Sequence, residues 1–180
     1  VLDIVALDHF GVEADIYTMA KSLGGGLPIG ATISRTSLGT IPAGSHANTF
    51  GGNLVSIAAA NASLEYIKKN LKKLEQEVKE KGSLMMKRLN EMKEKYEIIG
   101  DVRGIGLMIG VEIVKDKYTK EYGVEEREKI LNKCFEDGLI LLPAGKSTIR
   151  FIPPITMKIE NIEKGLDIFE SAVKYASNKV

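Results

Sequence analysis

The sequence is poor in several residue types, and each scarcity excludes a class of protein. Cys134 is the single cysteine among 180 residues, which excludes an intramolecular disulfide and a cysteine-ligated metal cluster. No run reaches the roughly 18 to 20 apolar residues of a transmembrane helix. Neither sign of charge dominates, because 25 Lys+Arg face 24 Asp+Glu and leave a formal net charge of +1. Nucleic-acid and polybasic membrane binders need concentrated positive charge and are therefore not expected.

What remains is the composition of a soluble globular protein. Apolar residues make up 44% and charged residues 27%, enough for one ordinary domain or parts of two. No secretory signal is visible, so the cytoplasm is the expected location. The chain begins at Val1 and is strand-like over residues 1–7. We therefore expect either an unusual start codon or a piece of a longer protein.

The first half of the chain is glycine-rich and weakly charged. Short apolar runs at 16–20 and 29–33, separated by glycines, predict buried strands of an α/β sheet. A helix is expected over 54–69 and a second over 71–96, where apolar residues recur at steps of three, four and seven. Gly82 lies inside the second helix and predicts a kink or a break there.

The second half reads as a compact α+β unit with its own core. Alternation of apolar residues from Ile105 to Ile113 predicts one half-buried strand. Apolar patterns bounded by glycine and proline predict the remaining elements, which are a helix at 125–137, strands at 139–142 and 148–152, and an amphipathic helix at 159–175.

One segment carries a signal for chemistry. Lys21 ends an apolar run and is followed at once by Gly24-Gly25-Gly26. Burial of an ammonium group is costly, and a desolvated lysine tends towards the neutral amine that reacts with aldehydes. The glycines would let the backbone pass close to a planar ligand. The alternative is a lysine whose stem lies along a strand end with its amine in water.

The same segment resembles the cofactor-lysine motif of the class III pyridoxal-phosphate aminotransferases, which include 4-aminobutyrate, acetylornithine and ornithine aminotransferases. The match departs from the family pattern mainly at Ala14, where proline is common. The matching blocks are Phe10–Ala31, His46–Asn53, Asp101–Glu112, Leu141–Lys146 and Ile149–Pro154, and they follow the family's order.

The resemblance implies roles for three residues. Lys21 would hold the aldehyde of pyridoxal 5'-phosphate as an imine and act as general base. Thr49 would bind the cofactor phosphate of the neighbouring subunit in a homodimer; otherwise it is a loop threonine capping a helix. Arg150 would bind the carboxylate of the substrate or of 2-oxoglutarate, and from the residues alone we would favour an edge-strand arginine paired with a surface acid.

The resemblance also implies a fold. The fold class is α/β: residues 1–76 correspond to the C-terminal remainder of the fold type I cofactor-binding large domain, and residues 77–180 to the small α+β domain. The family's earlier Asp-Glu-x-x-Gln segment, whose aspartate keeps the cofactor ring nitrogen protonated, has no counterpart here. Asp3 and Asp8 do not stand in a matching context.

Three functions follow as hypotheses. The first is an aminotransferase that moves an amino group from a donor, of which 4-aminobutyrate is our preferred example, to a 2-oxo acid. The second is an amino-acid racemase of the same family, which needs the same lysine. The third is a non-catalytic remnant that persists as a folded or dimerising module. Of the other candidates, Cys134 is expected in the core, Arg103 in a turn, and His9 and His46 in loops without a catalytic role.

Overall fold

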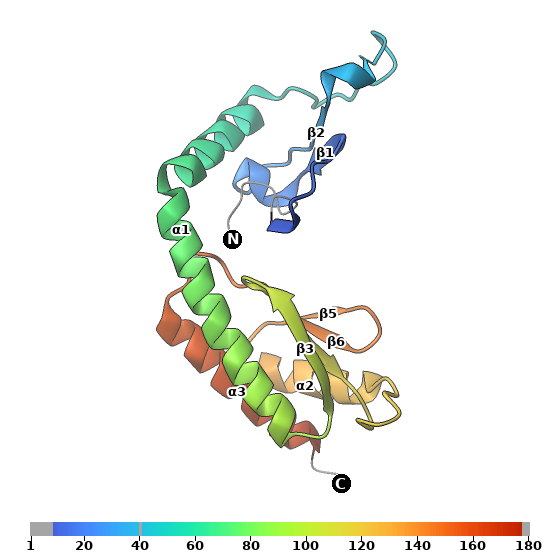
Figure 1. The fold of residues 1–180 in the computed structure, drawn as a ribbon, viewed down its shortest axis with the longest axis vertical. Coiled ribbons are helices and arrows are strands. Elements are labelled where there is room, and N and C mark those ends of the chain that lie inside the picture. Colours follow the sequence, from blue (N-terminus) through green and yellow to red (C-terminus); the bar gives the residue numbers. More distant parts are fainter. Residues whose placement is uncertain (1–8, 40, 178–180) are drawn as a thin grey trace. The chain divides into compact units, whose positions relative to one another are not determined.

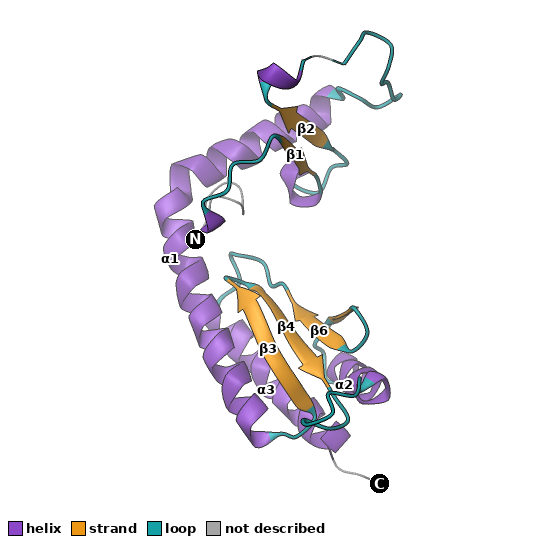
Figure 2. Ribbon diagram, turned by 45° about the vertical axis from the view of Figure 1, so that its right-hand side comes forward, coloured by secondary structure: helices purple, strands orange, loops and turns teal. Residues whose placement is uncertain are grey.

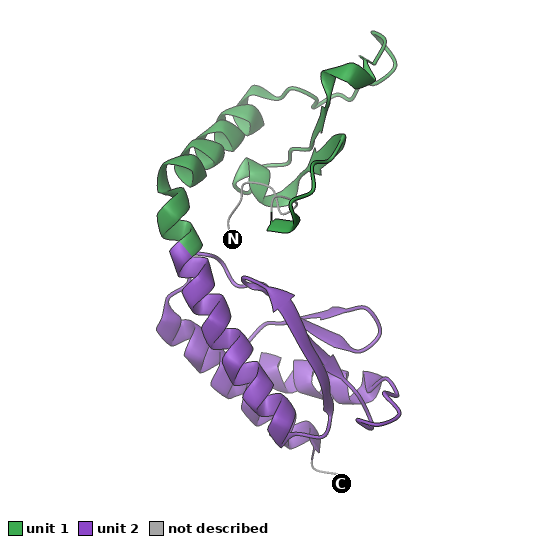
Figure 3. Ribbon diagram, viewed as in Figure 1, with its two compact units in different colours: residues 1–75 green, residues 76–180 purple. Residues whose placement is uncertain are grey.

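The computed structural model describes residues 9–39 and 41–177 and forms two compact units, residues 1–75 and 76–180 (Figure 3). The chain contains both helices and strands, and one long helix begins in the first unit and ends in the second (Figures 1 and 2). In order, the elements are β1 (Ile16–Met19), η2 (Lys21–Gly24), β2 (Ala31–Ser34), η3 (Thr36–Leu38), α1 (Leu54–Lys95), β3 (Ile99–Ile105), β4 (Met108–Ile113), α2 (Val124–Glu136), β5 (Leu142–Ala144), β6 (Thr148–Phe151) and α3 (Ile159–Ser177).

In the first unit, β1 and β2 form a two-stranded antiparallel sheet in which Ile16 pairs with Ser34 and Met19 with Ala31. The prediction of strands at these two runs is confirmed, but the prediction that they are buried is wrong. Ile16 and Ile33 are 56% and 52% exposed. A two-stranded sheet gives each strand one partner, and apolar side chains become buried only when further layers cover them.

Helix α1 starts at a side-chain cap. Asn53 precedes the first helical residue, and its Oδ1 accepts hydrogen bonds from the backbone N–H groups of Val55 and Ser56 at 3.1 and 3.0 Å. These donors have no partner within the helix, so the cap stabilises its first turn. The helix then continues without interruption to Lys95, and the break predicted at Gly82 is wrong.

Gly82 serves close packing rather than a bend. A Cβ atom at this position would lie 2.5 Å from the backbone oxygen of Gly106, which follows β3. Only a residue without a side chain lets helix and turn approach this closely. The cost of glycine in a helix, about 1 kcal/mol relative to alanine, is thus offset by the contact between α1 and the turn.

Replacing Gly82 by alanine is therefore expected to destabilise the second unit. The gain in helix propensity is smaller than the cost of forcing a methyl group against backbone, and we expect a net loss of about 2 kcal/mol in the free energy of unfolding. Urea unfolding followed by circular dichroism measures it. Ser83→Ala, at the neighbouring exposed position, is the matched control and should change stability little. Equal stability of Gly82→Ala and Ser83→Ala would contradict the close contact.

The second unit is built on a four-stranded antiparallel sheet with the strand order β3-β4-β6-β5. The single strand predicted from Ile105 to Ile113 is wrong, because a two-residue turn at Gly106 and Leu107 folds the segment into the hairpin of β3 and β4. Gly106 has a φ of 58°, which suits the tight reversal. Leu107 is buried in the turn, so the apolar alternation continues through it and hides the reversal.

Helices pack on one face of this sheet and enclose the core (Figure 2). The aromatic rings of Phe151 and Phe169 meet edge-to-face at 5.0 Å between β6 and α3. Other fully buried side chains come from all parts of the unit, including Leu89, Ile99, Ile109, Val111, Ile113, Ile130, Ile149, Leu166 and Val173. Among the described residues, Ala60 and Leu74 are the only buried apolar side chains of the first unit. The core of the chain is therefore almost wholly that of the second unit.

The two later helices are confirmed. α2 carries Glu125 and Glu126 in its first turn and Lys133 in its last, which complements the helix dipole. The strand predicted at 139–142 is displaced, since β5 begins at Leu142. No helix in the described ranges is long and apolar enough to cross a membrane.

Candidate cofactor and carboxylate sites

Lys21 lies directly beyond β1, in the first position of the short helix η2. Its φ is +60°, and among the described residues Lys120 is the only other non-glycine with a positive φ. This left-handed conformation is unfavourable for a residue with a Cβ and is typical of positions held for a functional reason. The backbone of the candidate lysine is therefore strained.

The burial expected for Lys21 is wrong, because its side chain is exposed. No hydrogen bond or ion pair holds its Nζ atom to any part of the chain that the structure describes. β1 and β2 form a sheet of two strands, and within the described residues no further strand pairs with them. The amine is thus free to react with a ligand.

The glycines after Lys21 shape the backbone of the turn. Gly25 and Gly26 have φ values of 58° and 107°. A Cβ atom at Gly24 would lie 2.8 Å from Cγ2 of Ile29, so a side chain there would displace the start of the return towards β2. The turn is consequently narrow, and its residues 24–26 present backbone without side chains.

Thr49 lies in an exposed turn a few residues before α1. The alternative that this threonine caps the helix is wrong, because Asn53 provides the cap. The sequence contains the signal for this cap, an asparagine immediately before the first apolar residue of a helix. Within residues 9–39 and 41–177, the hydroxyl of Thr49 forms no hydrogen bond.

Arg150 lies in β6, paired with Gly110 of β4 on one side and Leu142 of β5 on the other. β6 is therefore an inner strand, and the alternative of an edge-strand arginine is wrong. No acid of the described chain forms an ion pair with the guanidinium of Arg150, which is exposed. An unpaired, exposed guanidinium on a rigid strand can bind a carboxylate.

Arg103 is the second arginine on this side of the sheet, and it lies in β3 rather than in the expected turn. Its Nη1 atom contacts Asp101 Oδ2 at 3.0 Å and Glu112 Oε2 at 2.6 Å. These hydrogen bonds raise the pKa of the Arg103 guanidinium above its ordinary value. Although desolvation opposes it, the neighbouring cations Arg103 and Lys93 hold the pKa of Asp101 below its usual value.

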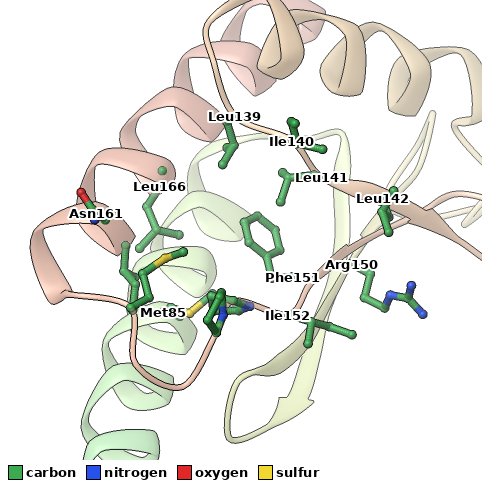
Figure 4. Close-up of a pocket in the computed structure, with 15 residues that line it drawn as sticks. Met85, Leu139, Ile140, Leu141, Leu142, Arg150, Phe151, Ile152, Asn161 and Leu166 are labelled. Carbon is green, nitrogen blue, oxygen red and sulfur yellow. The ribbon is translucent and has the colours of Figure 1, made fainter. Parts of the chain in front are cut away.

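An apolar cleft of about 320 Å³ opens between α3 and the segment that leads into β5. Figure 4 shows Leu139, Leu141, Phe151 and Leu166 around it, with the guanidinium of Arg150 at the edge and directed away. Arg150 therefore lines the rim of this cleft, while its guanidinium points away from the apolar interior.

Lys81 is a buried cation that sequence reasoning missed. Its Nζ atom donates to Glu77 Oε2 at 2.8 Å and to the carbonyl oxygen of Ile155 at 2.6 Å. The spacing of Glu77 and Lys81, four residues apart on a helix, was the available signal. Lys81 joins α1 to the segment between β6 and α3.

The remaining sequence candidates are one cysteine and two histidines. Cys134 is buried in α2, and desolvation raises the pKa of its thiol to about 12. His9 and His46 are exposed, and His9 packs edge-to-face on Phe10 at 5.0 Å. In the described part of the chain, no group of three or more histidine, cysteine or acidic residues could hold a metal ion.

Comparison with known proteins identifies the family of the chain. The profile of the family "Aminotransferase class-III" matches residues 3–173. The chain belongs to the class III aminotransferases. Lys21 and Thr49 thus lie in the first unit and Arg150 in the second unit of a chain from a pyridoxal-phosphate-dependent family.

Individual relatives support the same assignment. Over 173 residues the chain is 43% identical to acetylornithine aminotransferase of Clostridium acetobutylicum, covering 95% of this chain and 42% of that protein. Over 169 residues it is 46% identical to leucine/methionine racemase of Thermococcus litoralis, covering 93% of this chain and 38% of that protein. The chain therefore spans about two fifths of these relatives.

Solved structures show the same fold. A Bacillus anthracis aminotransferase superposes with a TM-score of 0.85 at 30% identity, over 94% of this chain and 40% of that one. Acetylornithine aminotransferase from Elizabethkingia anophelis superposes with a TM-score of 0.80 at 28% identity, over 96% and 42%. The predicted α/β class, shared with pyridoxal-phosphate-dependent transaminases, is confirmed.

The described residues fit the cofactor of this family in one respect, which is the amine of Lys21. Pyridoxal phosphate carries an aldehyde, and Lys21 offers an exposed primary amine without a competing acid, beside a turn that is narrow at Gly24. A side chain at Gly24 would disturb this turn. The described residues thus include an amine that fits the aldehyde of the cofactor.

Proposed function

We propose that this chain supplies the lysine-bearing and carboxylate-binding parts of a pyridoxal-phosphate-dependent aminotransferase. The reaction would move an amino group from a donor such as 4-aminobutyrate to a 2-oxo acid. The observation that carries the proposal is the exposed, strained and unpaired Lys21 inside a family match over residues 3–173.

Each site residue then has a definite task. Lys21 holds the cofactor through Nζ and, when that atom is free, takes the proton from the substrate carbon and returns it as general base and acid. Arg150 binds and orients a substrate carboxylate by paired N–H donors. Pyridoxal phosphate, when bound, supplies an aldehyde and a ring that delocalises the charge of the deprotonated substrate carbon.

The assembly belongs to the same proposal. Thr49 would donate its hydroxyl to the cofactor phosphate of a neighbouring copy, which makes the working form a homodimer. Residues 1–76 would be the remainder of the large domain and residues 77–180 the small domain. The cytoplasmic location stays a prediction.

A second candidate is amino-acid racemisation. The observation in its favour is the 46% identity to leucine/methionine racemase of Thermococcus litoralis, which is as extensive as the identity to the aminotransferases. Racemisation needs the proton returned to the opposite face of the same carbon, and Lys21 can serve both reactions.

A chimera tests these functions against each other. The upstream part of the Clostridium acetobutylicum aminotransferase, fused to this chain, would supply what the chain does not span. We expect amino transfer from 4-aminobutyrate to a 2-oxo acid, with the Lys21→Ala chimera as the inactive control. Conversion of L-leucine to D-leucine without a 2-oxo acid would favour the racemase instead. A folded, cofactor-loaded chimera without either activity would favour the non-catalytic remnant.

A further inference from the structure

Two arginines lie in one row across the open face of the second unit's sheet. Arg103 of β3 pairs with Gly110 of β4, and Gly110 pairs with Arg150 of β6. Directly paired residues project to the same face, and neighbouring strands lie about 4.8 Å apart. The backbone positions of the two arginines are therefore about 10 Å apart, and Gly110, which has no side chain, lies between them.

The two arginines differ in charge balance. Arg103 is held by Asp101 and Glu112, and Asp101 also contacts Lys93 Nζ at 3.2 Å. The two carboxylates thus balance Arg103 and Lys93. Arg150 forms no ion pair with a described acid, so the row presents one uncompensated positive charge.

The next row of the same face is apolar. Ile105 and Met108 pair with each other at the end of the β3–β4 hairpin and are 49% and 60% exposed. Both line the open cleft that also contains Arg103, Gly110 and Arg150. Ile105 and Met108 lie two residues along their strands from Arg103 and Gly110. The apolar part of a ligand bound at the arginine row would therefore cover these two side chains.

We propose that this face selects ligands with a single carboxylate and an apolar chain, and that Glu112 is the specificity-determining residue. Resting on the proposed role of Arg150, this inference narrows the substrate class of that site. Arg150 binds the carboxylate, while Ile105 and Met108 contact the apolar chain. Glu112 holds Arg103 and so denies a second carboxylate its partner. The expected substrates are amino or 2-oxo acids with one carboxylate, and dicarboxylates are disfavoured.

Two matched ligands and one charge substitution test the proposal on the full chain. The chain contains five arginines, which can be ¹⁵N-labelled and followed by NMR at Nε. 4-Methylpentanoate offers one carboxylate and an apolar chain, and glutarate offers two carboxylates. In the unaltered chain we expect both ligands to shift Arg150 and neither to shift Arg103, with glutarate binding no more tightly than 4-methylpentanoate.

Glu112→Gln removes the shorter of the two ion pairs of Arg103 and leaves the one with Asp101, so part of the guanidinium charge becomes available to the ligand. Glutarate affinity is then expected to rise about fivefold, as for one added half-exposed ion pair, and the Arg103 signal should shift. The affinity for 4-methylpentanoate should stay within about twofold because it has no second carboxylate to place. Glu136→Gln, which removes the same charge from an exposed position of α2, should change neither affinity.

The double variant Arg103→Met with Glu112→Gln removes cation and carboxylate together and should return to the unaltered preference. If Glu112→Gln alone does not fold, a double variant that binds glutarate more tightly than 4-methylpentanoate would overturn the inference, because Arg103 is then absent and cannot bind the second carboxylate. Tight glutarate binding with an Arg103 shift in the unaltered chain would overturn the inference, as would an unchanged glutarate affinity in folded Glu112→Gln. If neither ligand shifts Arg150, the proposed function's carboxylate site fails instead.

Discussion

Lys21→Ala should abolish site-specific attachment of pyridoxal phosphate to this chain. The physical reason is that Lys21 combines an exposed, unpaired amine with a narrow glycine turn, whereas several other lysines are engaged by acids. The purified chain is incubated with pyridoxal phosphate and reduced with borohydride, which fixes the cofactor covalently to the amine. Peptide mass mapping should then find the main adduct at Lys21 in the unaltered chain. In the variant, no other lysine should carry a comparable adduct.

Lys69→Ala is the matched control, because Lys69 is an exposed lysine of α1 whose nearest acid, Glu65, is 4.0 Å away. Its removal should leave the adduct at Lys21 unchanged. Adducts spread evenly over the surface lysines in the unaltered chain would contradict the proposed role. The non-catalytic remnant would then be the better description of this polypeptide.

Residues 76–180 produced alone should unfold in one cooperative transition, and residues 1–75 alone should show none. Residues 76–180 contain nearly all of the buried apolar side chains of the described chain. In residues 1–75, large side chains such as Phe50 and Leu54 are 80% and 81% exposed. Burial of apolar surface is the main source of stability, and a domain of about 100 residues typically gains a net 5 to 15 kcal/mol.

Scanning calorimetry and urea unfolding of the two fragments measure this difference. A third fragment that begins at residue 90 is the control, because it lacks the buried Met85 and Leu89 and should fail to fold. A cooperative transition in residues 1–75, or its absence in residues 76–180, would show that the core is not distributed as the structure has it.

The sequence predicted well those elements whose stability is local. α2 and α3 each carry an amphipathic period, and glycine or proline marks a boundary, so their observed bounds lie within two residues of the predicted ones. The period of the buried stripe also placed the second half of α1 correctly. Local patterns suffice wherever one face of one element determines what it buries.

Prediction failed where the determining contact is distant in sequence. Gly82 looks like a helix breaker until Gly106, which packs against it, is known. The β3–β4 hairpin is hidden because Leu107 is buried in the turn and keeps the apolar alternation intact. A one-dimensional pattern cannot distinguish a glycine that loosens a helix from one that admits another backbone.

Some features of the candidate site could likewise be predicted from the sequence, and others could not. Family resemblance pointed to Lys21, Thr49 and Arg150, and the structure removes the structural alternatives for the last two through Asn53 and the inner position of β6. The exposure of Lys21 could not be predicted, because it depends on which layers cover its strand. The pairing of Arg103 with Glu112 likewise depends on the register of two strands.

The location of the chain's one thiol has a practical consequence for judging assembly. Cys134 is enclosed in α2, so two natively folded copies cannot bring their sulfur atoms together. Its raised pKa of about 12 also keeps the reactive thiolate scarce near neutral pH. A disulfide-linked dimer on a non-reducing gel would therefore have formed from unfolded molecules. A homodimer of the folded protein would be non-covalent and should run as a monomer in detergent.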